Sequence, residues 1–154
     1  MKRILGVAAL LFSSISGLAA ARPDFSGTWT FVPEKSKNIG MMTQMRMTQV
    51  IAESPSALDV TSKTAFQGRD QETKTHYDLT GKSATNDSPM AGPSETVSKW
   101  DGDKLVTTWT SNGAVAGTKT VRTETRSLSQ NGKIMTVESV RGSNAPLVMI
   151  FERQ

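Results

Sequence analysis

The sequence predicts an all-β protein, an antiparallel up-and-down meander of about 8–10 strands closed into a barrel. Three observations carry this prediction. Short runs of alternating apolar and polar residues recur along the chain, and tight-turn sequences separate them with no helical crossover segment between. Threonine, which favours strands, occurs 19 times. We expect closure because an open sheet of this many strands would leave two long edges exposed.

The chain begins with the pattern of a secretory signal peptide over residues 1–21. It has a positively charged start (MKR), an apolar stretch (ILGVAALLF) and small residues that end in Ala19-x-Ala21. The apolar stretch is well short of the ~20 residues that span a bilayer, and no cysteine follows it to carry a lipid. We therefore expect cleavage before Arg22, no membrane anchor, and a periplasmic or secreted protein whose residues 22–154 form a single barrel domain.

Composition argues against several classes of protein. Loss of Lys2 and Arg3 with the signal peptide reduces the 18 basic residues to 16, which against 14 acidic ones leaves a net charge of +2. The basic residues are scattered and lack interleaved aromatic residues, so nucleic-acid binding is not expected. The absence of cysteine excludes thiolate catalysis and most structural zinc sites, and no cofactor is indicated.

Nine runs of strand length follow the signal peptide. In chain order they are Thr28–Val32, Thr43–Ala52, Ala57–Phe66, Glu72–Leu79, Thr96–Trp100, Lys104–Ser111, Lys119–Ser129, Ile134–Arg141 and Leu147–Arg153. Alternation is clear in several: Met47 and Ile51 share a face of the second run, and Met149 and Phe151 share a face of the last. Only the stretch PEKSKNIGMM (33–42) has room for a helical turn or two.

Turn sequences separate these runs. They are ESPS (53–56), FQGRD (66–70), TGKS (80–83), SPMAGPS (88–94), DGDK (101–104), SNGAVAG (111–117), QNGK (130–133) and GSNAP (142–146). Asp-Gly and Asn-Gly between extended runs predict hairpins with type I′ turns, which need positive φ at both central residues. Consecutive strands are therefore expected to be antiparallel neighbours.

The stretch PDFSGTWTF (23–31) places Gly27-Thr28-Trp29 on the first strand, where it resembles the start of the lipocalins and fatty-acid-binding proteins, the calycin barrels. The segments SKWDGDKLVTTWT, TRSLSQNGKIMTVESVRG and LVMIFERQ are similar to the closing hairpins of fatty-acid-binding proteins. The mature chain also resembles a group of small exported bacterial proteins of unassigned function, which begin with D-F-S-G-T-W and end near F-E-R. The resemblance implies a calycin-like barrel that binds a small apolar or amphipathic molecule.

The resemblance also implies a structural role for Trp29. In the calycins this tryptophan sits at the closed end of the barrel, and an arginine from a late strand packs across it. Arg153 is the first candidate for that partner and Arg126 the second. A large ring plugs the narrow end, and a guanidinium on its face adds a cation–π attraction. We expect Trp29 and Arg153 to close the barrel, not to touch a ligand.

Two features of fatty-acid-binding proteins are missing from the sequence. Those proteins hold the ligand carboxylate with an Arg-x-Tyr on the last strand, where this chain has Phe151-Glu152-Arg153. Their lid of two helices does not fit into the stretch 33–42. Fatty-acid specificity is therefore not carried over to this chain.

Six residues are candidates for the lining of a ligand cavity. They are Met45, Met47, Tyr77, Trp109, Arg122 and Arg126. Methionine adapts its shape, so the run MMTQMRM (41–47) suits a portal for apolar ligands, and it equally suits the filling of irregular core gaps. Trp100 and Trp109 lie on either side of the Asp-Gly turn; one is expected in the core, and one that faces the cavity would stack on a flat ligand.

The stretch VRTETRS places Glu124 between Arg122 and Arg126 on one face of a strand. Outside the barrel the three charges would form a solvated ladder. Inside, they would form a polar pocket bottom able to meet an anionic group of a ligand. The outer face is favoured, because burial of three charges is costly unless they pair.

No residue arrangement indicates catalysis, so an enzyme is not expected. His76 is the single histidine; alternation places it on one face with Asp78, whose carboxylate could steady the imidazole, and Tyr77 on the other. An ordinary strand histidine is favoured. Asp101 and Asp103 lie in a turn, where Asp is common, and neither a D-x-D-x-D loop nor a histidine cluster indicates a metal site.

The leading functional hypothesis is an exported barrel that binds a small apolar or amphipathic molecule in a cavity lined by alternate strand residues. The alternative is a protein-interaction module, such as a periplasmic protease inhibitor or an envelope adaptor, with the loops 86–94 and 112–117 as contact surfaces. A purely structural role in the envelope is not distinguished from this alternative by the sequence.

Overall fold

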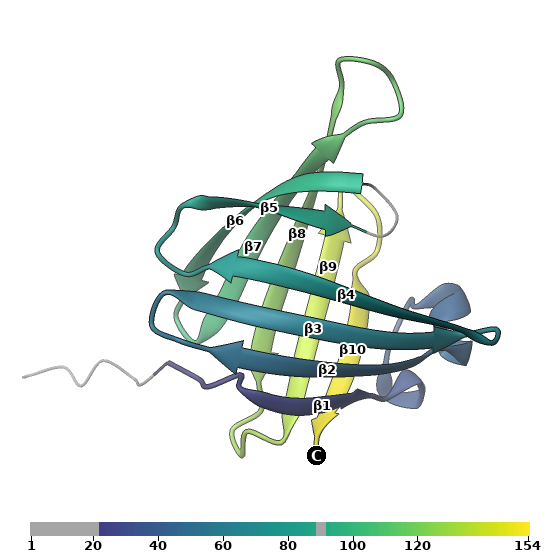
Figure 1. Cartoon of the computed structure of the whole chain (residues 1–154), viewed down its shortest axis with the longest axis vertical. Coiled ribbons are helices and arrows are strands. Elements are labelled where there is room, and N and C mark those ends of the chain that lie inside the picture. Colours follow the sequence, from purple (N-terminus) through teal and green to yellow (C-terminus); the bar gives the residue numbers. More distant parts are fainter. Residues whose placement is uncertain (1–21, 89–91) are drawn as a thin grey trace, which may run out of the picture.

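The computed structural model describes residues 22–88 and 92–154, so the predicted signal peptide and part of the predicted loop 86–94 lie outside the described residues. Strands dominate the described chain (Figure 1). The elements are β1 (Gly27–Phe31), η1 (Pro33–Lys35), η2 (Gly40–Gln44), β2 (Arg46–Glu53), β3 (Ala57–Phe66), β4 (Arg69–Asp78), β5 (Ser83–Ser88), β6 (Gly92–Asp101), β7 (Lys104–Asn112), β8 (Lys119–Leu128), β9 (Ile134–Arg141) and β10 (Leu147–Arg153), where η1 and η2 are short 3-10 helices. Within the described ranges no helix is long and apolar enough to cross a membrane.

Antiparallel pairing joins the ten strands in the order β4-β3-β2-β1-β10-β9-β8-β7-β6-β5. β1 pairs with β10, with Trp29 opposite Arg153, so the first and last strands are neighbours in the barrel wall. Figure 1 shows β1 to β4 running across the direction of β7 to β10, which places the lumen between these two layers. The predicted up-and-down barrel is confirmed.

β4 and β5 stand at the two ends of this strand order, and one side chain joins them. The Asn86 amide accepts the His76 backbone N–H and donates to the His76 carbonyl, both at 2.8 Å. A further hydrogen bond of 2.8 Å runs from Asn86 to the Thr96 hydroxyl. A side-chain amide offers the same donor and acceptor as a peptide unit, so Asn86 continues the pairing across this seam.

Three predicted strands match the structure at both ends: Ala57–Phe66, Ile134–Arg141 and Leu147–Arg153. The predicted start of a strand at Thr43 is wrong, because η2 continues to Gln44 before β2 begins. The expectation of a helical turn or two in the preceding stretch is confirmed by the two 3-10 helices.

β5, whose sequence is SATNDS, is absent from the predicted strands. Alternation of apolar and polar residues cannot reveal this strand, because its buried residue, Asn86, is itself polar. The same gap in the pattern hides the beginning of β6, which starts at Gly92 and not at Thr96.

The hairpin turns differ in type from the prediction at the Asp-Gly pair and at both Asn-Gly pairs. At QNGK only Gly132 has positive φ, and at SNGAVAG neither Asn112 nor Gly113 has it. Between the paired residues Phe66 and Arg69, Gln67 and Gly68 have φ of 49° and 74°, as a type I′ turn requires. In the DGDK hairpin only Gly102, with φ of 61°, has positive φ. That hairpin is confirmed, but its type I′ turn is wrong; positive φ at the first central residue alone is the type II′ pattern.

Trp29 fills the closed end of the barrel and is fully buried. Its indole N–H donates to the Phe25 carbonyl at 2.8 Å, and the Arg153 guanidinium lies 4.3 Å from the ring centre. The structure therefore places Arg153, and not Arg126, across this ring.

Arg153 also ties the N-terminal segment to the closed end. Its guanidinium donates to three backbone carbonyls, those of Asp24, Ser26 and Gly132. Gly27 makes room for this arrangement, because its φ is +124° and a Cβ there would lie 3.0 Å from the Arg153 Nη1 atom. The glycine of the Gly-x-Trp stretch is thus required by its backbone conformation and by the approach of the arginine.

The inward-pointing residues divide the lumen into two halves. In the closed half they are buried: Trp29, Ile51, Leu58, Val60, Thr96, Ser98, Leu105, Thr107, Met135, Val137 and Phe151. In the mouth half most residues that continue the same inward series are only half-buried: Met47, Ser62, Thr64, Thr73, Arg122, Ser139, Leu147 and Met149. On β6 and β7 the series stays buried at Ser94, Trp109 and Ser111. Side chains therefore fill one half and leave solvent access to the other.

Candidate ligand-binding site

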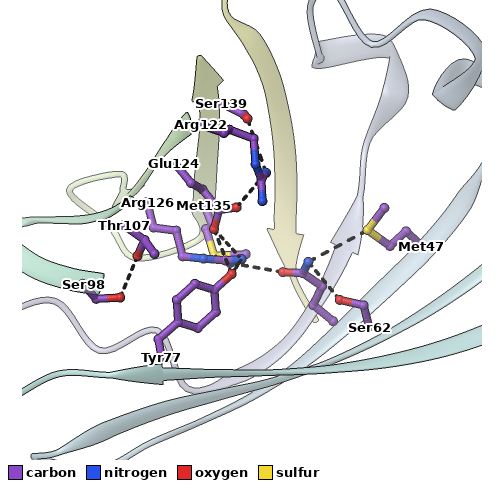
Figure 2. A network of polar contacts seen from close by, with 11 residues as sticks. Met47, Ser62, Tyr77, Ser98, Thr107, Arg122, Glu124, Arg126, Met135 and Ser139 are labelled. Atoms are coloured by element: carbon purple, nitrogen blue, oxygen red, sulfur yellow. Dashed lines mark hydrogen bonds and ion pairs between the residues drawn. The ribbon is translucent and has the colours of Figure 1, made fainter. Parts of the chain in front are cut away.

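A line of polar side chains crosses the lumen where the two halves meet. We call Gln49, Tyr77, Glu124 and Arg126 the cross-lumen bridge. Arg126 extends from β8 and donates to Gln49 Oε1 on β2 at 3.2 Å and to the Tyr77 hydroxyl on β4 at 3.3 Å. Figure 2 shows the extended Arg126 side chain reaching Tyr77, with Glu124 and Met135 beside it. The bridge thus connects opposite walls of the barrel.

Glu124 neutralises the buried arginine of the bridge. Its carboxylate lies 3.3 Å from Arg126 Nη2 and accepts the Tyr77 hydroxyl at 2.9 Å. Glu124 and Arg126 are 5% and 4% exposed, so this pair is almost free of solvent screening. Hydrogen bonds to charged groups are strong in such surroundings, which makes the bridge a rigid part of the lumen.

Protonation within the bridge follows from burial. Burial raises the pKa of Tyr77, the nearby Glu124 carboxylate raises it further, and the phenol therefore stays a donor. Burial alone would lower the pKa of Arg126, but Tyr77 and Glu124 outweigh this effect and raise it. Tyr77 is therefore protonated and Arg126 is a cation at physiological pH.

Arg122 lies above the bridge on the same strand and reaches the solvent-accessible mouth half. Its side chain is 25% exposed, and its Nη1 lies 3.4 Å from both Glu124 Oε2 and the Ser139 hydroxyl. The guanidinium stacks over the Trp109 ring at 4.5 Å from the ring centre. Both hydrogen bonds are long, so Arg122 keeps donors for a further acceptor.

The favoured outer-face placement of these three charges is wrong. Glu124 and Arg126 are buried inside the barrel, and Arg122 points into the mouth half. The cost of burial is offset because Glu124 pairs with both arginines. In addition, the Tyr77 hydroxyl donates to the Glu124 carboxylate, and Gln49 accepts a hydrogen bond from Arg126. The sequence alone does not reveal these two neutral partners, which come from β2 and β4.

Two buried donors at this site have no hydrogen-bond partner among residues 22–88 and 92–154. They are Trp109 Nε1 and Arg126 Nε. The Tyr77 ring meets Trp109 edge-on, with ring centres 6.0 Å apart. Buried donors without an acceptor are uncommon in native proteins, so an acceptor supplied by a bound molecule would stabilise this region.

The methionine candidates lie nearer the mouth. Met47 is half-buried, packs against the core, and its sulfur lies 3.9 Å from Gln49 Nε2. Met45 follows η2 as its C-terminal cap, where its N–H donates to the Met42 carbonyl, and it is half-buried. The structure thus brings Tyr77, Trp109, Arg122 and Arg126 together, with Met47 beside them, and leaves Met45 at the edge of this group.

Sequence reasoning misses Gln49 and Ser139 as parts of the site. Gln49 lies between Met47 and Ile51 on the inward face of β2. A polar residue that interrupts an apolar face is a usable signal, because it needs a buried partner. Ser139 offers no comparable signal.

The remaining polar candidates lie on the outside. His76 Nδ1 contacts Asp59 Oδ1 at 2.7 Å, and both side chains are at least half exposed. The suggested support from Asp78 is wrong, because that carboxylate accepts the Thr80 N–H at 2.7 Å and the Thr80 hydroxyl at 2.6 Å. In the described parts of the chain no three His, Cys, Asp or Glu residues gather as metal ligands would.

Two open hollows lie near the ends of the strands. The larger, about 550 Å³, is lined by residues 46–48, 63–65 and 70–72 on β2, β3 and β4. The smaller, about 230 Å³, is lined by residues of β5 to β8 such as Thr85, Ser111 and Lys119. The cross-lumen bridge and Arg122 line neither hollow.

No protein-family model matches this chain, and no curated protein matches its sequence. A REP1-NXSQ fatty acid transporter superposes with a TM-score of 0.65 at 15% identity, over 84% of this chain and 95% of that one. Fatty-acid-binding protein 1 of Echinococcus granulosus gives 0.65 at 12% identity, over 84% and 96%. Human cRBP IV gives 0.63 at 17% identity, over 85% and 98%. This likeness shows the calycin-like barrel fold.

Proposed function

We propose that the protein binds a small amphipathic molecule in the mouth half of its lumen, with an anionic group of that molecule held by Arg122. The observation that carries the proposal is the partly exposed Arg122 guanidinium inside the barrel, with long contacts to Glu124 and Ser139. Similar folds include proteins named for fatty acids, which is in keeping with such a ligand.

The charges favour a ligand with one negative group. Arg122, Glu124 and Arg126 together carry a net charge of +1 inside the barrel. A carboxylate on the free edge of Arg122 would continue the alternation of charge and bring the lumen to neutrality. Trp109 would hold the guanidinium in place from its other side, because the two already stack at 4.5 Å.

The surrounding wall suits an apolar chain. Leu147 and Met149 on β10 and Met47 on β2 are half-buried and pack against the core. Their remaining exposed surface is the apolar area that a ligand would remove from water, and each buried methylene contributes about 0.8 kcal/mol. Flexible methionine and leucine side chains adapt to ligands of varied shape.

A matched pair of probes tests this proposal. We expect decanoate to displace a polarity-sensitive dye at a concentration at least about tenfold lower than decanol does, because a charge-assisted hydrogen bond contributes about 1.5–3 kcal/mol. Arg122→Gln should remove this preference. The control Lys99→Gln also removes a positive charge, at an exposed position of β6, and should leave it intact. Equal affinity of the wild-type protein for the two probes would contradict the role of Arg122.

The natural ligand can be sought directly. Native mass spectrometry of the protein, isolated gently from its own source, should show an added mass that disappears on denaturation, and chromatography would identify the released compound. A protein that co-purifies with a ligand-free barrel would instead favour the interaction module, the alternative hypothesis. Val115, 67% exposed in the loop between β7 and β8, supplies an apolar contact for that alternative.

We also propose that the protein is exported and cleaved before Arg22. The described structure is in keeping with this site, since the Arg22 guanidinium already stacks over Trp100 at 5.2 Å and Phe25 is fully buried. Sequencing of the N-terminus of the protein from an extracytoplasmic fraction tests the proposal. A chain that retains Met1, or that remains in the cytoplasm, would contradict it.

A further inference from the structure

We propose that the cross-lumen bridge sets how deep a ligand can enter, so that the protein selects short or compact amphipathic molecules over long-chain ones. The inference rests on the proposed function, because it concerns the ligand of the same site. It assigns Gln49, Tyr77, Glu124 and Arg126 the role of specificity-determining residues.

The bridge is continuous from wall to wall. Gln49 Nε2 donates to the Ser62 hydroxyl on β3 at 3.2 Å, and its Oε1 accepts Arg126 from β8 at 3.2 Å. Arg126 in turn contacts Met135 on β9, with Nη1 3.6 Å from the sulfur. Five strands are therefore linked across the lumen once Tyr77 on β4 is included. A chain that passed this level would have to break hydrogen bonds to buried charged groups.

The space beyond the bridge is already occupied. Leu58, Trp29, Met135, Val137 and Phe151 are all 0% exposed, so no solvent reaches them. Protein interiors of this kind are close-packed, so an acyl chain could enter only by displacing core side chains. On the mouth side Arg122 is 25% exposed, so a ligand group can reach it from solvent.

This arrangement predicts how affinity varies with chain length. A ligand whose carboxylate lies on Arg122 gains about fourfold in affinity for each methylene that the mouth half covers. Once the chain reaches the bridge, further methylenes stay in water and add little. In a lumen without this barrier, affinity would continue to increase with each methylene up to long-chain ligands.

The test is a series of saturated carboxylates, hexanoate, octanoate, decanoate, myristate and palmitate, each below its aggregation concentration. For the wild-type protein we expect affinity to rise at first and then to level off before palmitate. A steady rise of about fourfold per methylene up to palmitate would overturn the inference and leave the proposed function in place. Failure of every carboxylate and of decanol to bind would instead overturn the proposed function.

Two variants place the barrier at the bridge. Arg126→Ala combined with Glu124→Gln removes the bridge without leaving a buried unpaired charge, and affinity should then continue to rise to a longer chain than in the wild type. Gln49→Ala shortens one end of the bridge without a change of charge and should give the same shift if the double variant does not fold. The control Lys99→Ala with Glu95→Gln changes charges at exposed positions of β6 and should leave the series unchanged. An unaltered series in both folded bridge variants would overturn the inference.

Discussion

The two halves of the lumen are lined by the same strands but by different kinds of side chain. The closed half contains large apolar groups such as Trp29, Leu105 and Phe151, each at most 1% exposed. Hydroxyl-bearing side chains occur in both halves, and the mouth half adds Arg122 and the methionines Met47 and Met149, all of them half-buried. One end of each strand therefore contributes chiefly to stability, and the other end offers surface for binding.

The largest effect is expected in the closed half. Trp29→Ala should lower the free energy of unfolding by about 5 kcal/mol, because it leaves a large cavity and removes the stacking partner of Arg153. Urea denaturation measures the change. Val121→Ala, at a position 51% exposed on β8, is the control and should stay within about 0.5 kcal/mol. A loss below about 1 kcal/mol for the tryptophan variant would contradict the account of the closed end.

The next effect concerns the boundary between the halves. Arg126→Met alone should destabilise the fold by about 3 kcal/mol, because the buried Glu124 loses its closest cation. Addition of Glu124→Gln should recover most of this loss in urea denaturation. Arg122→Gln, in the mouth half, should cost about 1 kcal/mol or less because its side chain is partly exposed. Equal losses of stability in the Arg126 and Arg122 variants would contradict the proposed boundary between the two halves.

The smallest effect is a pH dependence at the closed end. Glu53 accepts the Phe25 N–H at 2.8 Å, and burial raises the pKa of Glu53 above its ordinary value, although the Phe25 hydrogen bond opposes this. A carboxyl with a raised pKa in the folded state stabilises the fold fully below its unfolded pKa, and this stabilisation is lost as the pH rises through the folded pKa.

Glu53→Gln keeps an oxygen acceptor and removes this titration. The urea midpoint of the variant should therefore rise relative to that of the wild type as the pH is raised from about 3 to about 7. Glu34→Gln, at an exposed position of η1, is the control. A difference that stays constant, or that moves the other way, would show that Glu53 is not perturbed as described.

Sequence reasoning recovers the parts of this protein that rest on local pattern. Alternation and turn residues give the strands of the barrel, and the Gly-x-Trp stretch marks the end that Trp29 fills. Local pattern does not predict whether Glu124 lies inside or outside the barrel, because its burial depends on Tyr77 and Gln49 from distant strands. A register shift of one residue inverts every such assignment, and propensity carries no information about a partner 47 residues away.

β5 shows a second limit of pattern reading. It has no apolar alternation. It pairs with β6 along its whole length, and across the seam to β4 one side chain, Asn86, pairs with the backbone of His76. Because a polar side chain takes the place of backbone pairing between β4 and β5, the sequence of β5 has the polar composition that is typical of a loop. Such a strand is recognised only when its neighbours are placed in three dimensions.

The division of the lumen is tested most directly by the three tryptophan indole N–H signals in a two-dimensional ¹H–¹⁵N spectrum during titration with decanoate. Trp109 lies beside Arg122, whereas the Trp29 N–H is bonded to Phe25 and Trp100 stacks on Phe25 and Arg22. The N–H groups of Trp109 and Trp100 both have no acceptor in the described chain. We predict that the Trp109 signal moves with saturation while those of Trp29 and Trp100 stay in place. Movement of the Trp29 or Trp100 signal as large as that of Trp109, or no movement of any of the three at saturating probe, would contradict the division of the barrel into a packed half and a binding half.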